Sequence, residues 1–441
     1  MTNSTSRRNF IKQSAITSAG VFWIAKTSWA KISPNEKLNI GVIGTANRAM
    51  ENMHEMGRES TQHGASENIV ALCDVDKKYL SVGKASYPEA RTYTDFRRLI
   101  DQKDIDAILV ATPDHTHAVA TMAALKSGRH VYCEKPLTHT VSEARAIREE
   151  AKKRKLVTQL GTQVHSWDNY RRVVEVLQSG AIGPVREVHV TIDVIYTAGA
   201  RPAGVAVPAE LDWDLWLGPV EYRPYSPEYV PRSWRNWWAF GGGTLSDFGC
   251  HYIDLAFWAL GIRVPTSVES EGPPVMEEGT PEWLIARYQF PGHDKQPPVK
   301  LNWYHGKKNG QPVRPPQFSE QGAPQGLGNG LLFIGDKGKL FADYTHYILY
   351  PEADFKGYVP PPKTIPSSPG QHAEWIRAIK TGGTTLCNFE YGGALTETAL
   401  LGNAAYRSGQ KIVWDAKNLK AVGNPAADKF IQHNYRKGWS L

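Results

Sequence analysis

Asp247 and His251 lie four residues apart, directly after the three consecutive glycines 241–243. This spacing puts both side chains on one face of a predicted helix that runs through Leu260 and is capped by Thr244 or Ser246. There a carboxylate can orient an imidazole or balance its charge, and an imidazole titrates near neutral pH. Taken alone, such a pair is more often a surface or capping interaction. Oxidation of a carbinol nevertheless requires such a base for the hydroxyl proton, and a donor that holds the oxygen.

Lys135 is the predicted donor. It follows a short apolar strand predicted over 130–133, and ligands of parallel α/β sheets bind at the carboxyl ends of strands. Its ammonium group could hold the alcohol oxygen or share the proton transfer, whereas a lysine outside that context would be solvated. His165, Arg235 and Trp237 are the predicted substrate neighbours. Arg235 and Trp237 belong to a tryptophan-rich loop over 197–240, whose indole rings suit the faces of sugars and equally suit a core or a subunit interface.

We predict no metal site. Asp247 and His251 could be combined with His165 or Asp254, but the spacing matches no strong zinc pattern. The four cysteines lie far apart and form no C-x-x-C pair, which indicates buried free thiols rather than a disulfide framework; they are Cys73, Cys133, Cys250 and Cys387.

A degenerate dinucleotide fingerprint follows the first predicted strand. Gly44 takes the first glycine position, Ala46 the second and Ala49 the third. Alanine at the second position is a departure, because that glycine lets the backbone approach a pyrophosphate closely. Asp74, at the end of the second predicted strand, would bind the ribose hydroxyls and repel a 2′-phosphate, which favours NAD over NADP. It lies thirty residues after Gly44 rather than the usual ~20, so a solvated turn aspartate is the alternative.

The apolar periodicity divides the chain at about Gly161. Before it, predicted strands alternate with helices, which implies a doubly wound parallel sheet of the α/β class. These strands cover residues 39–44, 68–73, 105–111, 130–133 and 156–160. After it, strands over 188–196, 283–290, 299–304, 331–334, 339–343 and 347–350 follow without intervening helices, which predicts a mainly antiparallel sheet. Further helices are predicted over 115–126, after a Thr140/Glu143 capping box, and near 372–380 and 394–408.

Three further segments carry a family resemblance: Ala-Thr-Pro-Asp-His-Thr-His over 111–117, Cys-Glu-Lys-Pro-Leu over 133–137, and the stretch 242–254. Over roughly 38–415 the chain closely resembles the glucose–fructose oxidoreductase / inositol dehydrogenase / rhizopine catabolism (Gfo/Idh/MocA) family. The resemblance implies a Rossmann domain over 36–161 and a C-terminal α/β domain with a large open sheet over 162–415. Residues 416–441 would form a tail, and its stretch 432–439 is similar to tails of the exported branch.

The resemblance also implies roles for single residues. Thr112, Pro113 and His117 match positions that line the cofactor, while Glu134 and Lys135 match the residues beside the nicotinamide. Asp247 and His251 match the acid/base pair. Together with the fingerprint this predicts a cofactor site of Gly44, Ala46, Asn47, Arg48, Asp74, Thr112, Pro113, His115, His117, Glu134, Lys135 and Gln163.

The chemistry implied is hydride transfer between a nicotinamide cofactor and a carbinol of a sugar, glycoside or cyclitol. The cofactor expected is a tightly held NAD, with NADP left open by the resemblance. The alternative is an NAD-dependent glycoside hydrolase or lyase that works through a transient keto-sugar, to which Tyr196 could contribute. A binding module without catalysis is a third hypothesis, motivated by Ala46 and Ala49. A homo-oligomer, a dimer or tetramer, is expected from the resemblance alone.

Residues 1–30 are predicted to be a targeting segment rather than part of the fold. Arg7 and Arg8 open a twin-arginine pattern, a short apolar stretch follows, and Ser28-Trp29-Ala30 offers a cleavage site. A disordered basic tail is the alternative. We therefore expect export to the periplasm through the Tat pathway, without stable membrane insertion. The net charge of +7 falls to +3 once the four basic residues of this segment are set aside, so nucleic acid is not an expected partner.

Overall fold

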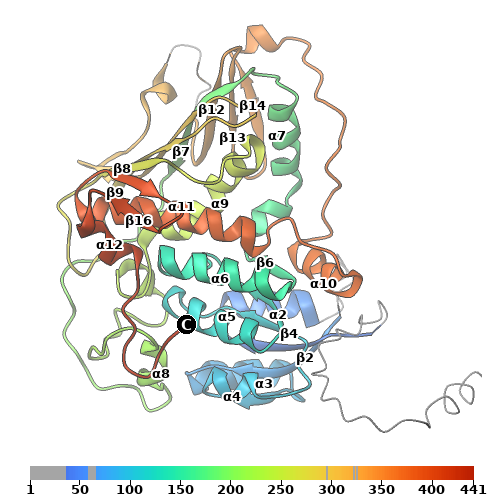
Figure 1. The fold of residues 1–441 in the computed structure, drawn as a ribbon, viewed down its shortest axis with the longest axis vertical. Coiled ribbons are helices and arrows are strands. Elements are labelled where there is room, and N and C mark those ends of the chain that lie inside the picture. Colours follow the sequence, from blue (N-terminus) through green and yellow to red (C-terminus); the bar gives the residue numbers. More distant parts are fainter. Residues whose placement is uncertain (1–35, 58–65, 295, 321–322, 324–325) are drawn as a thin grey trace, which may run out of the picture.

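The fold is known from a computed structural model, which describes residues 36–57, 66–294, 296–320, 323 and 326–441. The predicted signal segment 1–30 lies outside the described residues, as does most of the stretch between the fingerprint helix and Asn68. Figure 1 shows two parts: a lower one built around the first sheet, and an upper one built around the second, with α11 (Phe389–Ser408) running between them.

The first sheet has six parallel strands in the order β3-β2-β1-β4-β5-β6. The strands are β1 (Asn39–Ile43), β2 (Asn68–Cys73), β3 (Arg91–Tyr93), β4 (Ala107–Val110), β5 (His130–Cys133) and β6 (Thr158–Leu160). The strand order reverses between β1 and β4, and such a reversal leaves a crevice at the carboxyl edge where ligands bind. Five strands confirm the predicted ones within a few residues. β3 is missing from the prediction because it is short and largely exposed.

Helices cover this sheet on both faces, as predicted. They are α2 (Arg48–Gly57), α3 (Lys77–Ser86), α4 (Phe96–Ile100), α5 (Asp114–Lys126) and α6 (Val141–Arg154). The predicted capping box begins α6, where the Thr140 backbone N–H donates to Glu143 at 2.9 Å. One covering helix comes from much later in the sequence. Residues Trp375, Ile376 and Ile379 of α10 (Gln371–Thr381) pack with the buried side chains of β1 and α2.

The second sheet is mixed and mostly antiparallel, as predicted, in the order β14-β13-β12-β7-β10-β9-β8-β15-β16 with β11 at the side of β10. Its strands are β7 (Val185–Ile192), β8 (Ser267–Glu271), β9 (Trp283–Phe290), β10 (Val299–Lys308), β11 (Gln311–Pro312), β12 (Gly330–Gly335), β13 (Lys339–Ala342), β14 (Tyr347–Tyr350), β15 (Ile412–Asp415) and β16 (Lys420–Val422). The one parallel pair joins β7 to β10. The alternating pattern predicted to 196 ends as a strand at Ile192, and the next residues turn toward α9 (Gly243–Leu260).

The helices of the upper part pack on one another and on this sheet. They are η1 (Gln163–Ser166), α7 (Asp168–Gln178), η2 (Ser233–Asn236), α9, α11 and α12 (Pro425–Ile431), while η3 (Pro316–Ser319) and η4 (Glu352–Phe355) lie in loops. Helix α8 (Trp213–Leu217) lies at the level of the lower part (Figure 1). The buried core of the second sheet continues without a break into that of the first. Helix α9 is buried almost throughout its length. Both sheets therefore form one rigid frame around the carboxyl edge of the first.

None of the helices within the described ranges combines the length and the apolar composition that crossing a bilayer would need.

Candidate active site

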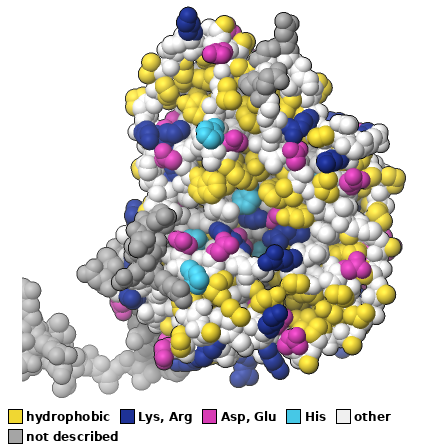
Figure 2. All heavy atoms as spheres, turned by 180° about the vertical axis from the view of Figure 1, so that it is seen from behind, with side chains coloured by type: hydrophobic (Ala, Val, Ile, Leu, Met, Phe, Trp, Pro, Cys, Tyr) yellow, Lys and Arg dark blue, Asp and Glu magenta, His cyan; other side chains and the backbone are white. Residues whose placement is uncertain are grey.

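A cleft of about 660 Å³ opens at the carboxyl edge of the first sheet, where it meets the loops and α9 of the upper part. Its volume is in the range of pockets that hold organic ligands and cofactors. Figure 2 shows charged and histidine side chains gathered in a hollow between the two parts of the molecule. Because the strand order is β3-β2-β1-β4-β5-β6, residues after β2 and β3 line one end of the cleft and residues after β5 and β6 line the other.

The fingerprint turn lines the middle of the cleft. Gly44 has a φ of +87°, and a Cβ there would lie 2.6 Å from the Ala111 carbonyl oxygen, so only glycine fits. Ala46, Asn47 and Arg48 follow at the N-terminus of α2 and also line the cleft. Helix N-termini attract anions, because their backbone N–H groups and the helix dipole point outward. This part of the cleft suits a pyrophosphate.

Glu134 and Arg48 form a second wall of that region. Glu134 accepts a hydrogen bond from Asn52 Nδ2 at 2.8 Å and pairs with Arg48 Nε at 3.3 Å. Its carboxylate lies directly against Gly161, where a Cβ would approach within 2.7 Å. Glu134 thus links α2, β5 and the turn after β6, and its proximity to the guanidinium holds Arg48 at the cleft.

Asp74 lines the cleft at the end of β2, where a ribose-binding carboxylate was predicted. Its Oδ2 accepts from both the backbone N–H and the hydroxyl of Thr45 at 2.9 Å, and its Oδ1 accepts from the Asp76 N–H at 3.0 Å. Burial raises the pKa of Asp74, while these hydrogen bonds oppose the shift. The contacts fix the carboxylate against the fingerprint turn, and its position disfavours a ligand that carries a phosphate there.

The tail closes the same end of the cleft. Trp439 lines it beside residues 94–96 and Leu215, with its ring 6.1 Å from that of Phe96 and 4.9 Å from the Arg97 guanidinium carbon. Arg436 anchors the tail through hydrogen bonds to the Gly218 carbonyl and Asp214. Figure 1 shows this segment running from α12 past α8 to the C-terminus. The tail motif was visible in the sequence, but the sequence alone could not place its tryptophan at the cleft.

At the opposite end, two cations share one buried carboxylate. Lys135 Nζ forms an ion pair with Asp247 Oδ1, and Arg235 Nε lies 3.0 Å from the same oxygen. Burial opposes ionisation of Asp247, but Lys135 and Arg235 outweigh it and hold its pKa well below the usual range. Lys135 and Arg235 line the cleft, whereas Asp247 is not among the lining residues and lies behind them. Asp247 therefore positions two cations that face the cleft.

His251 lines the cleft one helical turn after Asp247. The expected hydrogen bond between them is absent from the described contacts, because the carboxylate is taken up by Lys135 and Arg235. Burial, with the charge of Lys135, lowers the pKa of His251 well below its usual value. The prediction that it titrates near neutral pH was therefore wrong, and the imidazole is neutral. Its Nδ1 is buried and has no hydrogen-bond partner within the described chain.

The predicted side-chain cap of α9 was also wrong. Gly242 is the N-cap residue and forms no side-chain bond. Thr244 instead accepts a hydrogen bond from the Tyr196 N–H at 3.0 Å and so ties the strand end to the helix. Tyr196 lines the cleft, and burial together with the charge of Asp247 raises the pKa of its hydroxyl to about 12. The phenol consequently keeps its proton and can donate a hydrogen bond.

Asp114 is a cleft residue that sequence reasoning passed over. It begins α5, it is 1% exposed, and neither carboxylate oxygen has a partner in another described residue. Burial raises its pKa to about 7; the positive charges of Arg235 and Lys135 oppose the rise, whereas the negative charge of Asp247 adds to it. The signal was available, since Asp114 lies between Pro113 and His115 in a motif that was otherwise assigned residue by residue.

The remaining predicted residues divide into two groups. Thr112, Pro113, His117 and Gln163 line the cleft. The two ring nitrogens of His117 lie 2.7 and 2.8 Å from the Pro136 and Thr112 carbonyl oxygens, which fixes both turns. His115, His165 and Trp237 are buried and are absent from the cleft lining.

Each of the three buried side chains has a packing explanation. His115 lies between the rings of Trp216 and Phe240, with its Nε2 2.8 Å from the Trp216 carbonyl oxygen. Trp237 packs in the same aromatic cluster and donates to the Glu228 carbonyl. Neighbouring Trp234 lines the cleft instead and stacks on Arg235, 4.1 Å from its guanidinium carbon. The second interpretation of the tryptophan-rich loop, a hydrophobic core, therefore holds for most of its rings.

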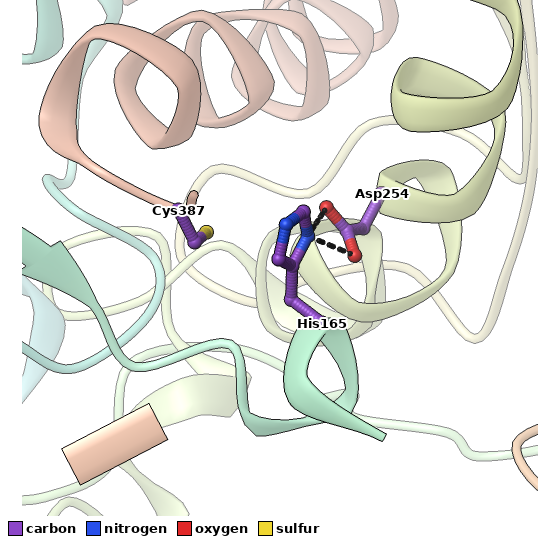
Figure 3. A group of neighbouring side chains, drawn as sticks. All are labelled: His165, Asp254 and Cys387. Carbon is purple, nitrogen blue, oxygen red and sulfur yellow. Dashed lines mark hydrogen bonds and ion pairs between the residues drawn. The ribbon is translucent and has the colours of Figure 1, made fainter. Parts of the chain in front are cut away.

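His165 belongs to a buried group with Asp254 and Cys387, in which one potential metal-ligand atom from each residue lies within 4.8 Å of the others. His165 Nδ1 lies 3.0 Å from both Asp254 oxygens, and Tyr391 donates to the same carboxylate at 2.6 Å. The imidazole stacks on Trp258 at 4.0 Å. Figure 3 shows the thiol and the carboxylate approaching the ring from opposite sides. These contacts describe a hydrogen-bonded support that holds η1, and hence Gln163, against α9.

The fold and the cleft together define an α/β protein with a sheet of the dinucleotide-binding type, in which Lys135 lines one end of the cleft. Family models agree. Residues 38–162 match the oxidoreductase family with an NAD-binding Rossmann fold, and residues 187–294 match the C-terminal α/β domain of the same family. The chain belongs to the Gfo/Idh/MocA oxidoreductase family, which confirms the resemblance and the nicotinamide class of cofactor.

Individual relatives cover part of the chain. Inositol 2-dehydrogenase 2 of Saccharopolyspora erythraea is 32% identical over 232 residues, which is 52% of this chain and 56% of that protein. Levoglucosan dehydrogenase of Pseudarthrobacter phenanthrenivorans is 31% identical over 175 residues, 38% of this chain and 36% of that protein. The chain thus aligns with about half the length or less of these relatives. The WlbA dehydrogenase of Bordetella pertussis, solved with NADH and UDP-GlcNAcA, has the same fold (TM-score 0.60, 16% identity, 86% of this chain and 99% of that one).

Proposed function

We propose that the protein is an NAD-dependent dehydrogenase that transfers a hydride between the cofactor and a carbinol of a sugar or cyclitol. The observation that carries this proposal is the arrangement of Lys135, Arg235 and His251 at one end of the cleft, with the fingerprint turn and Asp74 toward the other. Inositol and levoglucosan dehydrogenases among the relatives support this substrate class.

The cleft residues fit a dinucleotide. Gly44 lets the fingerprint turn pack closely against the Ala111 backbone, α2 directs its N-terminus into the cleft, and Asp74 is fixed at the end of β2. Trp439, Phe96 and Arg97 offer a flat, partly apolar site at that same end, suited to an adenine. When bound, the nicotinamide supplies the acceptor or donor of the hydride.

The chain's own residues would manage the proton and the substrate oxygen. Lys135 donates a hydrogen bond to the carbinol oxygen and stabilises the negative charge that develops on it as its proton leaves. The neutral His251 accepts the proton or a hydrogen bond from it. Asp247 keeps Lys135 and Arg235 directed at the substrate, and Arg235 binds a neighbouring hydroxyl. Asp114, whose pKa lies at about 7, is placed to pass a proton onward.

The decisive experiment starts from the purified chain without residues 1–30. Its absorbance and fluorescence are recorded as isolated, to detect tightly bound NAD, and again after adding free sugars, glycosides and inositols. Stoichiometric reduction of the nicotinamide by one of these compounds, abolished in Lys135→Met, supports the proposal. Steady release of aglycone without net reduction would assign the chain to the redox-neutral glycoside hydrolases or lyases instead. Absence of any NAD or NADP binding would leave only a binding module.

We also propose export through the Tat pathway, supported by the twin-arginine pattern at Arg7 and Arg8. Expression of the full chain and of a variant with both arginines replaced by lysine, followed by cell fractionation, tests this. Periplasmic accumulation of the first alone is expected, and equal distribution of both would refute it. A homo-oligomer is the expected assembly, and light scattering of the purified chain measures it directly.

A further inference from the structure

A second cavity of about 270 Å³ lies behind the start of α9, and the two cavities have no lining residue in common. It is enclosed by α11, α12, the tail and the turn before α9. Residues that face it include His139, Arg223, Trp238, Arg407, Phe430 and His433. The tail motif that the catalytic cleft leaves unexplained therefore lines this cavity at His433 and the cofactor cleft at Trp439.

Arg407 gives the cavity its chemistry. Its guanidinium carbon lies 4.8 Å from the Trp238 ring and 4.2 Å from the Phe430 ring, so the cation is held between two aromatic faces. No hydrogen bond or ion pair joins this guanidinium to another residue in the described part of the chain. Burial lowers its pKa to about 10, opposed by Glu278. An arginine side chain stays charged in proteins, so it has no neutral form in which to be buried cheaply.

Glu278, the carboxylate whose negative charge acts on Arg407, already pairs with other residues. Glu278 binds Arg223 at 2.7 Å and also pairs with Arg201, so it serves two other arginines. Exposed Lys429 adds a further positive charge to the lining, and exposed Glu221 is the acidic side chain among the lining residues. The cavity consequently carries an excess of positive charge around one unpaired cation.

Two imidazoles add unused hydrogen-bonding atoms. His139 Nε2 lies 3.2 Å from the Gly241 carbonyl oxygen, while its Nδ1 is buried without a partner. His433 Nε2 is likewise buried without one in the described chain, and the two rings are 6.2 Å apart. Buried polar atoms are normally satisfied by protein, water or ligand. Their grouping with Arg407 around one cavity indicates a polar ligand.

We propose that this second cavity binds a small organic or inorganic anion through a carboxylate or phosphate group held by Arg407. A guanidinium presents paired N–H donors that match both groups, and flanking aromatic rings keep it directed into the cavity. Aromatic contacts alone compensate part of the charge. The purely structural alternative is that the aromatic sandwich is the whole role of Arg407.

The test uses NAD-saturated protein, so that the pyrophosphate region of the cofactor cleft is filled. Inorganic phosphate and glucuronate are titrated by calorimetry in chloride buffer of constant ionic strength, into wild type, Arg407→Met and the exposed control Arg377→Met. Saturable binding of one anion at one site is expected in wild type and control. Loss of the cation should weaken it by roughly 30-fold or more. Preference for phosphate or for glucuronate identifies the group that the site takes.

A parallel titration of NAD-free protein completes the test. Three outcomes would overturn the proposal: no saturable binding of either anion to wild type, equal binding to Arg407→Met, or binding that is seen in NAD-free protein alone. Arg407→Lys guards against a folding defect, because it keeps the charge between the rings but loses the paired donors. An unfolding midpoint equal to that of wild type would show that the fold of Arg407→Lys is intact. We expect this variant to bind the anion more weakly than wild type even then. A lysine variant with wild-type affinity would also refute a guanidinium-specific site.

Discussion

Replacement of Asp114 by asparagine should change the pH dependence of stability. The side chain is buried at the start of α5, and burial raises its pKa from 3.8 to about 7. Between those two values the folded protein keeps a proton that the unfolded chain has lost, so unfolding releases it and stability falls as pH rises. Below pH 3.8 both states are protonated, and above pH 7 both are ionised, so the loss is confined to that window.

The size of the effect follows from the shift. Each pKa unit corresponds to about 1.4 kcal/mol. Ionisation of this carboxyl therefore lowers the free energy of unfolding by about 2.5 kcal/mol between pH 5 and pH 7.5. Asparagine has the same shape and no charge to bury. Asp114→Asn should therefore gain stability relative to wild type as pH rises across this range. The buried amide also changes the free energy of unfolding, but by an amount that does not depend on pH.

Urea unfolding followed by tryptophan fluorescence, at several pH values between 5 and 7.5, measures this difference. Asp101→Asn is the matched control, because Asp101 is exposed on the surface, and its difference from wild type should stay nearly constant. If the Asp114→Asn difference were just as constant, burial would not hold the proton on Asp114. The proposed relay of protons through this residue would fall with it.

Four further changes test the site. Lys135→Met should lower kcat/KM by about 10²- to 10⁴-fold, with NAD affinity by fluorescence titration unchanged; a comparable loss of NAD binding would contradict a role at the substrate. Trp439→Ala should weaken NAD binding about tenfold and leave the KM of the sugar alone, whereas equal losses in both would misplace the tail. Gly44→Ala, at φ +87° and 2.6 Å from a carbonyl oxygen, should abolish NAD binding and lower the unfolding midpoint; wild-type values would refute the steric argument. Cys387→Ser should keep activity, and metal analysis of wild type should find no stoichiometric ion; an ion lost on this substitution would make the buried group a metal site.

Local patterns were enough to predict the first sheet except for β3. Its strands are continuous apolar runs bounded by polar turns, and parallel sheets bury such strands on both faces. β3 escaped because three exposed residues carry no such run, and β8, β15 and β16 escaped because they are short edge or near-edge strands. α10 was found as a helix, yet nothing in its periodicity indicates that it covers the first sheet rather than the second.

The active site also combines features that the sequence predicts with features that depend on the tertiary structure. The sequence by itself determined the glycine turn, Asp74, Lys135 and the α9 pair, because each lies at a fixed offset from a strand end or on one helical face. The tertiary structure decided how they are used. In the folded protein Asp247 pairs with Lys135 and Arg235 rather than with His251. His165 and Trp237 are buried in the core, and Trp439 lines the cofactor cleft. Spacing along the chain fixes only neighbours within an element, whereas burial and the sign of facing charges depend on elements more than a hundred residues apart.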